Sequence, residues 1–293
     1  MRIALCVKEV LDATGPFSLT EETSSLNNMG LVPIPNPADL AALALVREAL
    51  PRGVAMVTAI NVGPASAEHV LRACVASGTD KAIRVWDSTL ASGGLSDDVI
   101  ARVLAAAISK IGFDLVVCGS RGLIGASGYV GPALAEYLDF AQVCSVSHLE
   151  VLPGQEVITV HRRLDHGDRE IVACRLPAVI TVDNGAADVP YASFPEVLTA
   201  ERVQIPVMDL ASIGLRSSDI RASDGSRLLY YIPPRPRTKK SPTPDKTLSP
   251  MQIMQQMMGG GAAKQGSNLI EGEPKKAAAE IIRFFVSNGI LPR

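Results

Sequence analysis

The stretch Asp114–Leu138 reads DLVVCGSRGLIGASGYVGPALAEYL. Leu115–Cys118 is a short apolar run, typical of a buried parallel strand. The next thirteen residues carry five glycines, and Ala133, Leu134 and Leu138 then recur at helical spacing. A strand, a glycine-rich loop and a helix start together direct free backbone N–H groups at an anion. The spacing fits neither the P-loop nor the strict G-x-G-x-x-G motif, so a crossover that only packs a helix on a sheet stays open as the alternative.

Outward from this stretch, strands and helices alternate from residue 3 to residue 138. Apolar runs predict strands, and Asn36-Pro37 and Ser96 followed by two aspartates are typical helix starts, with Asn36 as the capping residue. The sequence therefore predicts an α/β protein: a Rossmann-like, doubly wound, mostly parallel sheet with helices on both faces. The predicted strands are 3–7, 54–62, 82–86 and 115–118, and the predicted helices begin at 36, 66, 96 and about 130.

Ligands of such sheets bind beyond the carboxyl ends of the strands. Here those ends are Cys6, Val62-Gly63 and Gly119, which come from three separate parts of the chain. Because the carboxyl ends of parallel strands meet at one edge, the three following loops should converge on one crevice. This convergence favours a nucleotide pocket over a purely structural glycine loop.

The remainder of the chain has a different pattern. Strand-like runs over 143–151, 156–163, 170–175 and 178–182, with turn signals between them, predict an antiparallel extension of the sheet. Residues 8–35 and 184–207 are predicted to be irregular. The predicted organisation is a nucleotide-binding domain (1–208), a linker or insertion (209–267) and a C-terminal arm with a docking helix (268–293). In that arm, Ala278, Ile281, Ile282 and Phe285 form one apolar stripe over 274–287.

The composition of the chain argues against several classes of function and location. Twenty-eight basic and thirty acidic residues give a net charge of −2, which argues against a nucleic-acid partner. Five scattered cysteines without a C-x-x-C pair are typical of a reducing compartment. The chain opens directly on a strand-like run and has no apolar run long enough to span a membrane, so a cytoplasmic location is expected.

No catalytic constellation is recognisable. His161, Asp165, His166 and Asp168 invite interpretation as a metal site, but they surround a predicted hairpin turn, where solvated polar clusters are common. We therefore predict no metal site and no catalytic residue. A pocket without catalytic machinery favours a protein that binds or carries something rather than one that transforms it.

These residues together resemble the electron-transfer flavoprotein β-subunit family. The most specific piece is 160–172, VHRRLDHGDREIV, followed by Leu176-Pro177-Ala178. Further similarity lies in Ala4–Lys8 with Asp12, Asn36-Pro37 with Glu48-Ala49, Val62–Pro64, Arg72, Ala76–Asp80, the glycine loop with Leu134–Leu138, Tyr191–Pro195 and Ile270–Pro274. Residues 2–208 and about 268–291 are covered by this resemblance, and about 212–266 are not.

The resemblance implies an electron carrier rather than an enzyme. Its expected partners are a larger α subunit, which holds the redox FAD, a flavin dehydrogenase as donor, and a downstream oxidoreductase, soluble or membrane-associated. This subunit is expected to hold AMP, or a second FAD as in electron-bifurcating members. Carried over to this sequence, the cofactor-binding residues are Cys6, Asn36, Val62, Gly63, Gly119, Gly122, Ser127, Gly128, Tyr129, Val130 and Gly131.

By the same resemblance, two other segments are expected to determine which partner and which nucleotide the protein binds. The loop by which family members recognise dehydrogenases corresponds here to Tyr191, Phe194, Pro195, Val197 and Leu198. In the glycine loop, residues 124–126 are Ile-Gly-Ala, where the family usually has acidic and polar residues, so recognition of ribose and base is expected to differ. Two alternatives stay open: a bifurcating-type subunit with its own FAD, favoured by 130–132 (Val-Gly-Pro), and an unrelated nucleotide-binding or nucleotide-hydrolysing protein on the same fold.

Overall fold

A computed structural model describes residues 1–12, 14, 18–19, 26–27, 31–91, 95–152, 154–221, 251, 273–287 and 290. By their contacts, residues 1–232 and 233–293 form two separate units. The predicted boundaries at 208 and 267 stay predictions. Most of the predicted linker or insertion (222–250 and 252–267) and the family-like segment at 270–272 lie outside the described residues.

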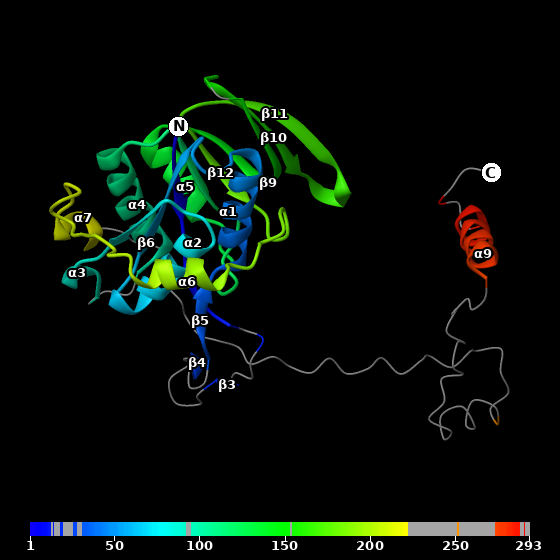
Figure 1. Cartoon of the computed structure of the whole chain (residues 1–293), viewed down its shortest axis with the longest axis horizontal. Helices are drawn as coiled ribbons and strands as arrows, with labels where there is room; N and C mark the ends of the chain where they lie inside the picture. Colours follow the sequence, from blue (N-terminus) through cyan, green and yellow to red (C-terminus); the bar gives the residue numbers. More distant parts are fainter. Residues whose placement is uncertain are drawn as a thin grey trace. The chain divides into compact units, whose positions relative to one another are not determined.

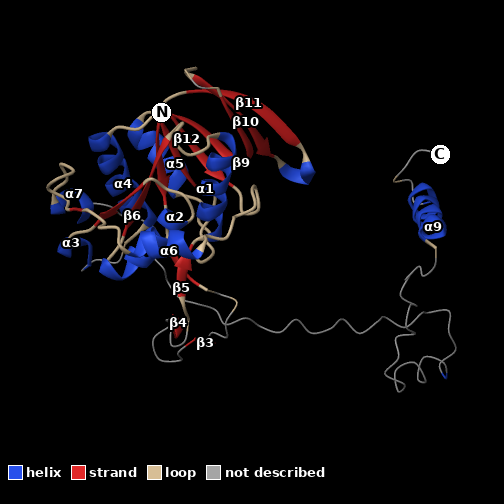
Figure 2. Ribbon diagram, in the orientation of Figure 1, coloured by secondary structure: helices blue, strands red, loops and turns tan. Residues whose placement is uncertain are grey.

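The first unit is built on one nine-stranded sheet (Figures 1 and 2) with the order β11-β10-β9-β12-β8-β1-β6-β7-β13. All neighbours from β9 to β13 pair in parallel, and β10 pairs antiparallel with both β9 and β11. The predicted fold class is therefore confirmed. The strands are β1 (Arg2–Cys6), β6 (Met56–Val62), β7 (Lys81–Val85), β8 (Leu115–Gly119), β9 (Ala141–Val151), β10 (Val157–Arg163), β11 (Arg169–Arg175), β12 (Ala178–Val182) and β13 (Val207–Met208).

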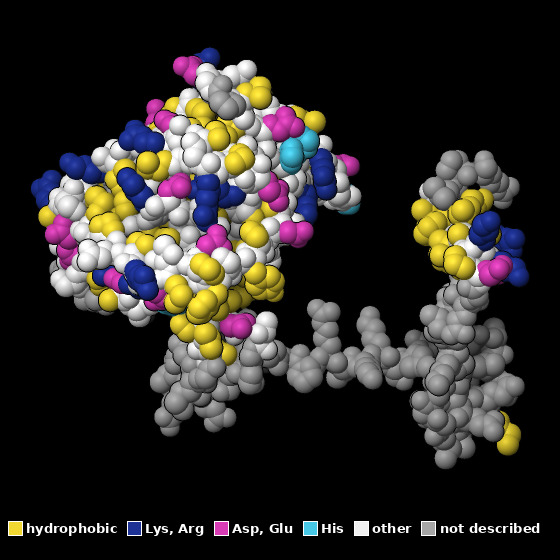
Figure 3. Space-filling view, viewed as in Figure 1, with side chains coloured by type: hydrophobic (Ala, Val, Ile, Leu, Met, Phe, Trp, Pro, Cys, Tyr) yellow, Lys and Arg dark blue, Asp and Glu magenta, His cyan; other side chains and the backbone are white. Residues whose placement is uncertain are grey.

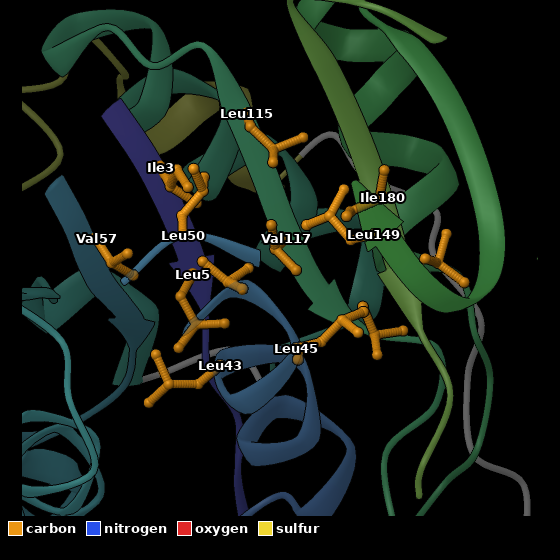
Figure 4. Close-up of a cluster of buried hydrophobic side chains, with 14 of the residues drawn as sticks. Ile3, Leu5, Leu43, Leu45, Leu50, Val57, Leu115, Val117, Leu149 and Ile180 are labelled. Carbon is orange, nitrogen blue, oxygen red and sulfur yellow. The ribbon is translucent and has the colours of Figure 1, made fainter. Parts of the chain in front are cut away.

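Helices cover both faces of the sheet because every central strand is apolar on both sides. In β1, Ile3 and Leu5 belong to the core under α1 (Pro37–Ala49) and α2 (Glu68–Ala76), part of which Figure 4 shows. Ala4 and Cys6 point to the opposite core, under α4 (Asp97–Ile111) and α5 (Val130–Leu138). This double burial accounts for the continuous apolar run of the strand.

Helix starts follow the predicted chemistry at Ser96, whose hydroxyl accepts from the backbone N–H of Val99 and caps α4. The helix start predicted at Asn36-Pro37 is confirmed, since α1 begins at Pro37 and Asn36 is its N-cap residue. The side chain of Asn36 makes no capping bond, because its amide group donates to Asp39 and to the backbone oxygen of Arg121 instead. The helix predicted from Ser66 is a short 3₁₀ turn, Ala65–Ala67, that leads into α2.

Three segments differ from the predictions. Residues 184–207 are not entirely loop-like: α6 (Phe194–Glu201) forms there, with a capping box between Ser193 and Glu196. The segment 8–35 contains β2 (Glu9–Leu11), which pairs antiparallel with β5 (Pro33–Pro35), and a second short pair, β3 (Ser18–Leu19) with β4 (Leu26–Asn27). β12 is not part of the antiparallel extension, because it inserts in parallel between β8 and β9.

The remaining described helices are α3 (Ser88–Ala91), the 3₁₀ turn Asp165–Gly167, α7 (Ser217–Arg221) and, in the second unit, α9 (Pro274–Ser287). The predicted C-terminal helix is thus present. No helix in the described part of the chain has the length and apolar character needed to span a membrane.

Candidate functional site

A cavity of about 240 Å³ lies beyond the carboxyl ends of β1, β6 and β8, the edge at which the sequence predicts a pocket. Its wall also takes in the start of α1, the glycine loop and the start of α5. All eleven predicted cofactor-binding residues line it: Cys6, Asn36, Val62, Gly63, Gly119, Gly122, Ser127, Gly128, Tyr129, Val130 and Gly131. The structure therefore brings these residues together, and their contact with a nucleotide stays a prediction.

Asn36 connects the start of α1 to the glycine loop. Its side-chain Nδ2 donates to the backbone oxygen of Arg121 at 3.1 Å, and its Oδ1 accepts from the backbone N–H of Leu123 at 3.0 Å. The side chain is 3% exposed, so the two bonds are shielded from water. Asn36 thus fixes the first turn of the loop rather than the end of the helix.

Asp39 holds two strand ends at the cavity wall, and the sequence analysis missed it. Its Oδ2 accepts from the backbone N–H of Lys8 at 2.8 Å, and its Oδ1 accepts from that of Gly119, also at 2.8 Å. Asn36 Nδ2 donates to the same Oδ1 at 3.1 Å. Burial raises the pKa of this carboxyl from 3.8 to about 6, and the hydrogen bonds from Lys8, Asn36 and Gly119 limit the rise.

The glycines of the loop have different physical roles. A Cβ on Gly119 would overlap Asp39 Oδ1 and come 2.7 Å from the Cβ of Ala38, and a Cβ on Gly131 would overlap Thr181. These two are glycines because the protein packs against them. Gly125 and Gly128 have φ of +87° and +64°, a left-handed conformation that other residues adopt at a cost. The glycines of the loop therefore do not share one physical role.

Polar groups of both signs line the cavity. The cations are Lys8 and Arg121, and a Cβ on Gly122 would lie 3.3 Å from Lys8 Nζ, which places this ammonium beside the glycine loop. Asn61 donates from Nδ2 to the backbone oxygen of Val7 at 2.9 Å. Its Oδ1 is buried and accepts no hydrogen bond from the described residues. A buried acceptor without a donor fits a ligand that donates a hydrogen bond at this point.

Two of the five cysteines, Cys6 and Cys118, belong to the cavity floor. They are register partners in β1 and β8, and both are buried. Burial raises the pKa of Cys6 to about 12, so its thiol stays protonated at neutral pH. All five cysteines are free thiols.

The predicted partner-binding residues form an exposed surface on and before α6. Tyr191, Phe194, Pro195, Val197 and Leu198 are all exposed, and Phe194 has 73% of its side chain accessible. Figure 3 shows hydrophobic side chains gathered where α6 lies in Figure 1. Phe194 is thus not folded into its own domain. Its contact with a partner stays a prediction.

The four residues of the hairpin region that were considered as a metal site do not come together. Among the described residues, no three of His161, Asp165, His166 and Asp168 bring their ligand atoms close to one another. His161 instead lies beside His148, with ring centroids 4.8 Å apart.

A doubly wound sheet with a cavity beyond its parallel strand ends defines the Rossmann-like class of α/β proteins. Residues 29–213 match the family model described as the electron transfer flavoprotein domain. The chain is 30% identical to the electron transfer flavoprotein subunit beta of Methylophilus methylotrophus over 81% of this chain and 90% of that protein. It is 28% identical to protein FixA of Azotobacter vinelandii (82% and 87%), and 29% identical to the caffeyl-CoA reductase-Etf complex subunit CarD of Acetobacterium woodii (80% and 88%). The chain belongs to the electron transfer flavoprotein β-subunit family, and it is an electron-transfer subunit of that type.

Proposed function

We propose that this protein is the β subunit of an αβ electron-transfer flavoprotein and holds an AMP-like nucleotide in the cavity. The α subunit holds the FAD that carries the electrons from a flavin dehydrogenase to a downstream oxidoreductase. The observation that carries the proposal is the cavity itself. It lies at the strand edge where this fold class binds nucleotides, and it collects residues from five separate parts of the chain.

The cavity offers partners for both the phosphate and the nucleoside part of a nucleotide. Lys8 and the first backbone N–H groups of α5 supply positive charge for a phosphate, since the amino end of a helix attracts anions. Asn61 Oδ1 is a buried acceptor suited to a hydroxyl or amino group of the ligand. The residues of this chain then bind and orient the nucleotide, and Asn36 and Asp39 keep the loop in place.

The docking role of α9 rests on its apolar stripe. Ile281, Ile282 and Phe285 are exposed on a helix that has no buried residue. Exposed apolar stripes of this kind mark surfaces that pack against a partner. Deletion of 268–293 should therefore weaken the association with the α subunit, and unchanged association would remove the helix from the interface.

A bifurcating-type subunit with its own FAD is the second candidate. Its support is the Val-Gly-Pro sequence at 130–132, which lies at the start of α5 and contributes Val130 and Gly131 to the cavity wall. The other alternative from the sequence, an unrelated nucleotide-binding or nucleotide-hydrolysing protein on the same fold, is set aside because residues 29–213 match the electron transfer flavoprotein domain.

Counting nucleotides separates the candidates. The full-length chain is purified with its co-purifying subunit, the complex is denatured in acid, and the released nucleotides are quantified by chromatography. One FAD and one AMP per complex supports the proposal, two FAD supports the second candidate, and one FAD without a second nucleotide would contradict both. Lys8→Gln should lower the nucleotide occupancy of the cavity. The matched control is Lys81→Gln, which should not change it, because Lys81 is the first residue of β7 and the cavity lies beyond the carboxyl ends of the strands.

A further inference from the structure

The outward face of the antiparallel extension carries a group of three side chains that lie outside the cavity lining and outside the predicted partner-binding residues. His148 and Glu150 stand on β9, and His161 stands opposite His148 on β10. Residues directly opposite in antiparallel strands point to the same face, and residues two apart on one strand also do. In Figure 3 histidine side chains are visible on the part of the surface formed by the extension.

The donor atoms of the three side chains are already close. His148 Nε2 lies 3.4 Å from Glu150 Oε1, and one ligand atom from each residue lies within 4.8 Å of the other two. Two ligands bound to one tetrahedral Zn²⁺ at about 2.0–2.1 Å are roughly 3.4 Å apart, so the His148–Glu150 pair already has the required separation. A small rotation of the half-buried His161 ring brings in the third donor.

The fold holds the backbone under this group in place. Leu149 and Val160, which alternate with the three residues along the strands, are register partners and are buried. The bond ladder between β9 and β10 shifts register just after His161. The three side chains therefore project from a fixed platform into solvent, where an ion can reach them without unfolding any element.

We propose that His148, Glu150 and His161 bind a divalent transition metal ion of the Zn²⁺ class, with water in the fourth position. Two imidazoles and one carboxylate are a donor set typical of zinc, and Mg²⁺ and Ca²⁺ prefer oxygen ligands alone. Because the ligands come from two strands, the ion ties β9 to β10. The site lies on the extension, away from the cavity lining, and does not depend on the nucleotide proposal.

Zinc titration of the metal-free protein tests the site. The full-length chain with its co-purifying subunit is stripped with a chelator and titrated by competition with a chromophoric chelator. We expect one zinc per complex with a dissociation constant in the micromolar range or tighter, lost in His148→Ala and His161→Ala and weakened about tenfold in Glu150→Gln. His166→Ala, a nearby histidine outside the group, is the matched control and should bind as the original chain does.

Cobalt substitution gives a second readout. A tetrahedral Co²⁺ ion with two nitrogen ligands should give visible absorption bands that disappear in both histidine variants, and acid should release the ion because protons compete for the imidazoles. Equal zinc affinity in the original chain and the three site variants, or binding only at millimolar zinc, would overturn the proposal. Should a histidine variant fail to fold, Glu150→Gln and the cobalt spectrum of the original chain decide the question.

Discussion

The cavity and the surface of α6 are built in opposite ways. The cavity is held by buried polar side chains that bridge distant segments: Asp39 connects Lys8 to Gly119, and Asn36 connects the start of α1 to the glycine loop. The α6 surface consists of exposed apolar side chains such as Phe194, which do not pack into the core. A substitution in the cavity wall should therefore disturb the packing of the fold, whereas a substitution on the α6 surface should not.

Because of this difference, substitutions in the two regions should have different effects on stability and on binding affinity. In the cavity, the hydrogen bonds that stabilise the fold also hold the walls of the proposed nucleotide site, so we expect stability and nucleotide affinity to fall together. On α6, stability and partner affinity rest on different atoms, because Ala200 packs inward while Phe194 faces solvent. Four substitutions test this contrast, from the largest expected effect to the smallest.

Gly119→Ala should have the largest effect. The new methyl group would displace Asp39 Oδ1 and press on Ala38, so the variant adds overpacking to the loss of a buried hydrogen bond. We expect a loss of about 3 kcal/mol or more in the free energy of unfolding. Urea denaturation measures it. Gly125→Ala, with open space around it and a left-handed backbone, is the control and should cost only about 1 kcal/mol. Equal losses would show that Asp39 and Ala38 move aside for the new methyl group, so that close packing at Gly119 adds no cost.

Asp39→Asn tests the buried carboxyl through pH. Its folded-state pKa is raised from 3.8 to about 6, so the folded protein binds this proton more tightly than the unfolded chain does. The stabilisation from Asp39 is therefore fully present below pH 3.8 and is lost as pH rises through about 6. Between these limits the stability of the original chain, relative to Asp39→Asn, should change by roughly 3 kcal/mol.

Urea denaturation of both chains across that range gives the difference directly. The comparison cancels the other carboxyl groups, which are common to both chains. A difference in stability that does not depend on pH would mean that Asp39 titrates normally. The cavity would then not be the dry, rigid region that the contrast with α6 requires.

Phe194→Ala should affect the partner and not the fold. Its side chain is 73% exposed, so its removal leaves the core and the cavity unchanged. The loss of an exposed aromatic anchor should cost about 2 kcal/mol of partner affinity. The electron-transfer rate, measured against partner concentration, reports the affinity, and the melting temperature should stay the same.

Ile171→Ala is the matched control, since Ile171 is 67% exposed on β11, outside the α6 surface. It should leave the rate curve unchanged. A normal curve for Phe194→Ala, or a fall in its melting temperature, would remove this residue from the partner surface.

The sequence predicts the sheet and the cavity edge because both follow from local patterns. Apolar runs identify strands, and the carboxyl ends of parallel strands must meet, so Cys6, Val62 and Gly119 could be brought together without coordinates. Asp39 was missed because an aspartate in the first turn of a helix is typical of helix electrostatics. Only the fold shows that its carboxyl faces two strand ends.

Other misses have physical causes too. Residues 184–207 were predicted to be irregular, although Ser193 and Glu196 with Pro195 between them are a helix-start signal that the sequence contains. The proximity of His148 and His161 depends on the register of a hairpin with a bulge. The local alternation of residues does not reveal a bulge, and a bulge changes which residues lie opposite one another.

Tyr129→Phe should have the smallest effect on stability. It compares a tyrosine that lines the cavity with Tyr137, which does not. Tyr129 and Tyr137 both donate to Asp98 Oδ1, from the end of the glycine loop and from α5 respectively. Tyr129 lines the cavity and Tyr137 does not. Because both hydroxyls lie at the surface, the loss of either bond should cost no more than about 1 kcal/mol of stability.

The two variants should differ in nucleotide binding. The bond from Tyr129 fastens the end of the glycine loop to α4, so its removal lets the loop move away from the ligand and should weaken nucleotide affinity by about fivefold. Tyr137→Phe should leave the affinity unchanged, because its bond joins two helices outside the cavity. Equilibrium titration of the nucleotide-free complex measures both. If the two variants bind equally well, the loop is held by Asn36 and Asp39 alone, and its outer end plays no part in the site.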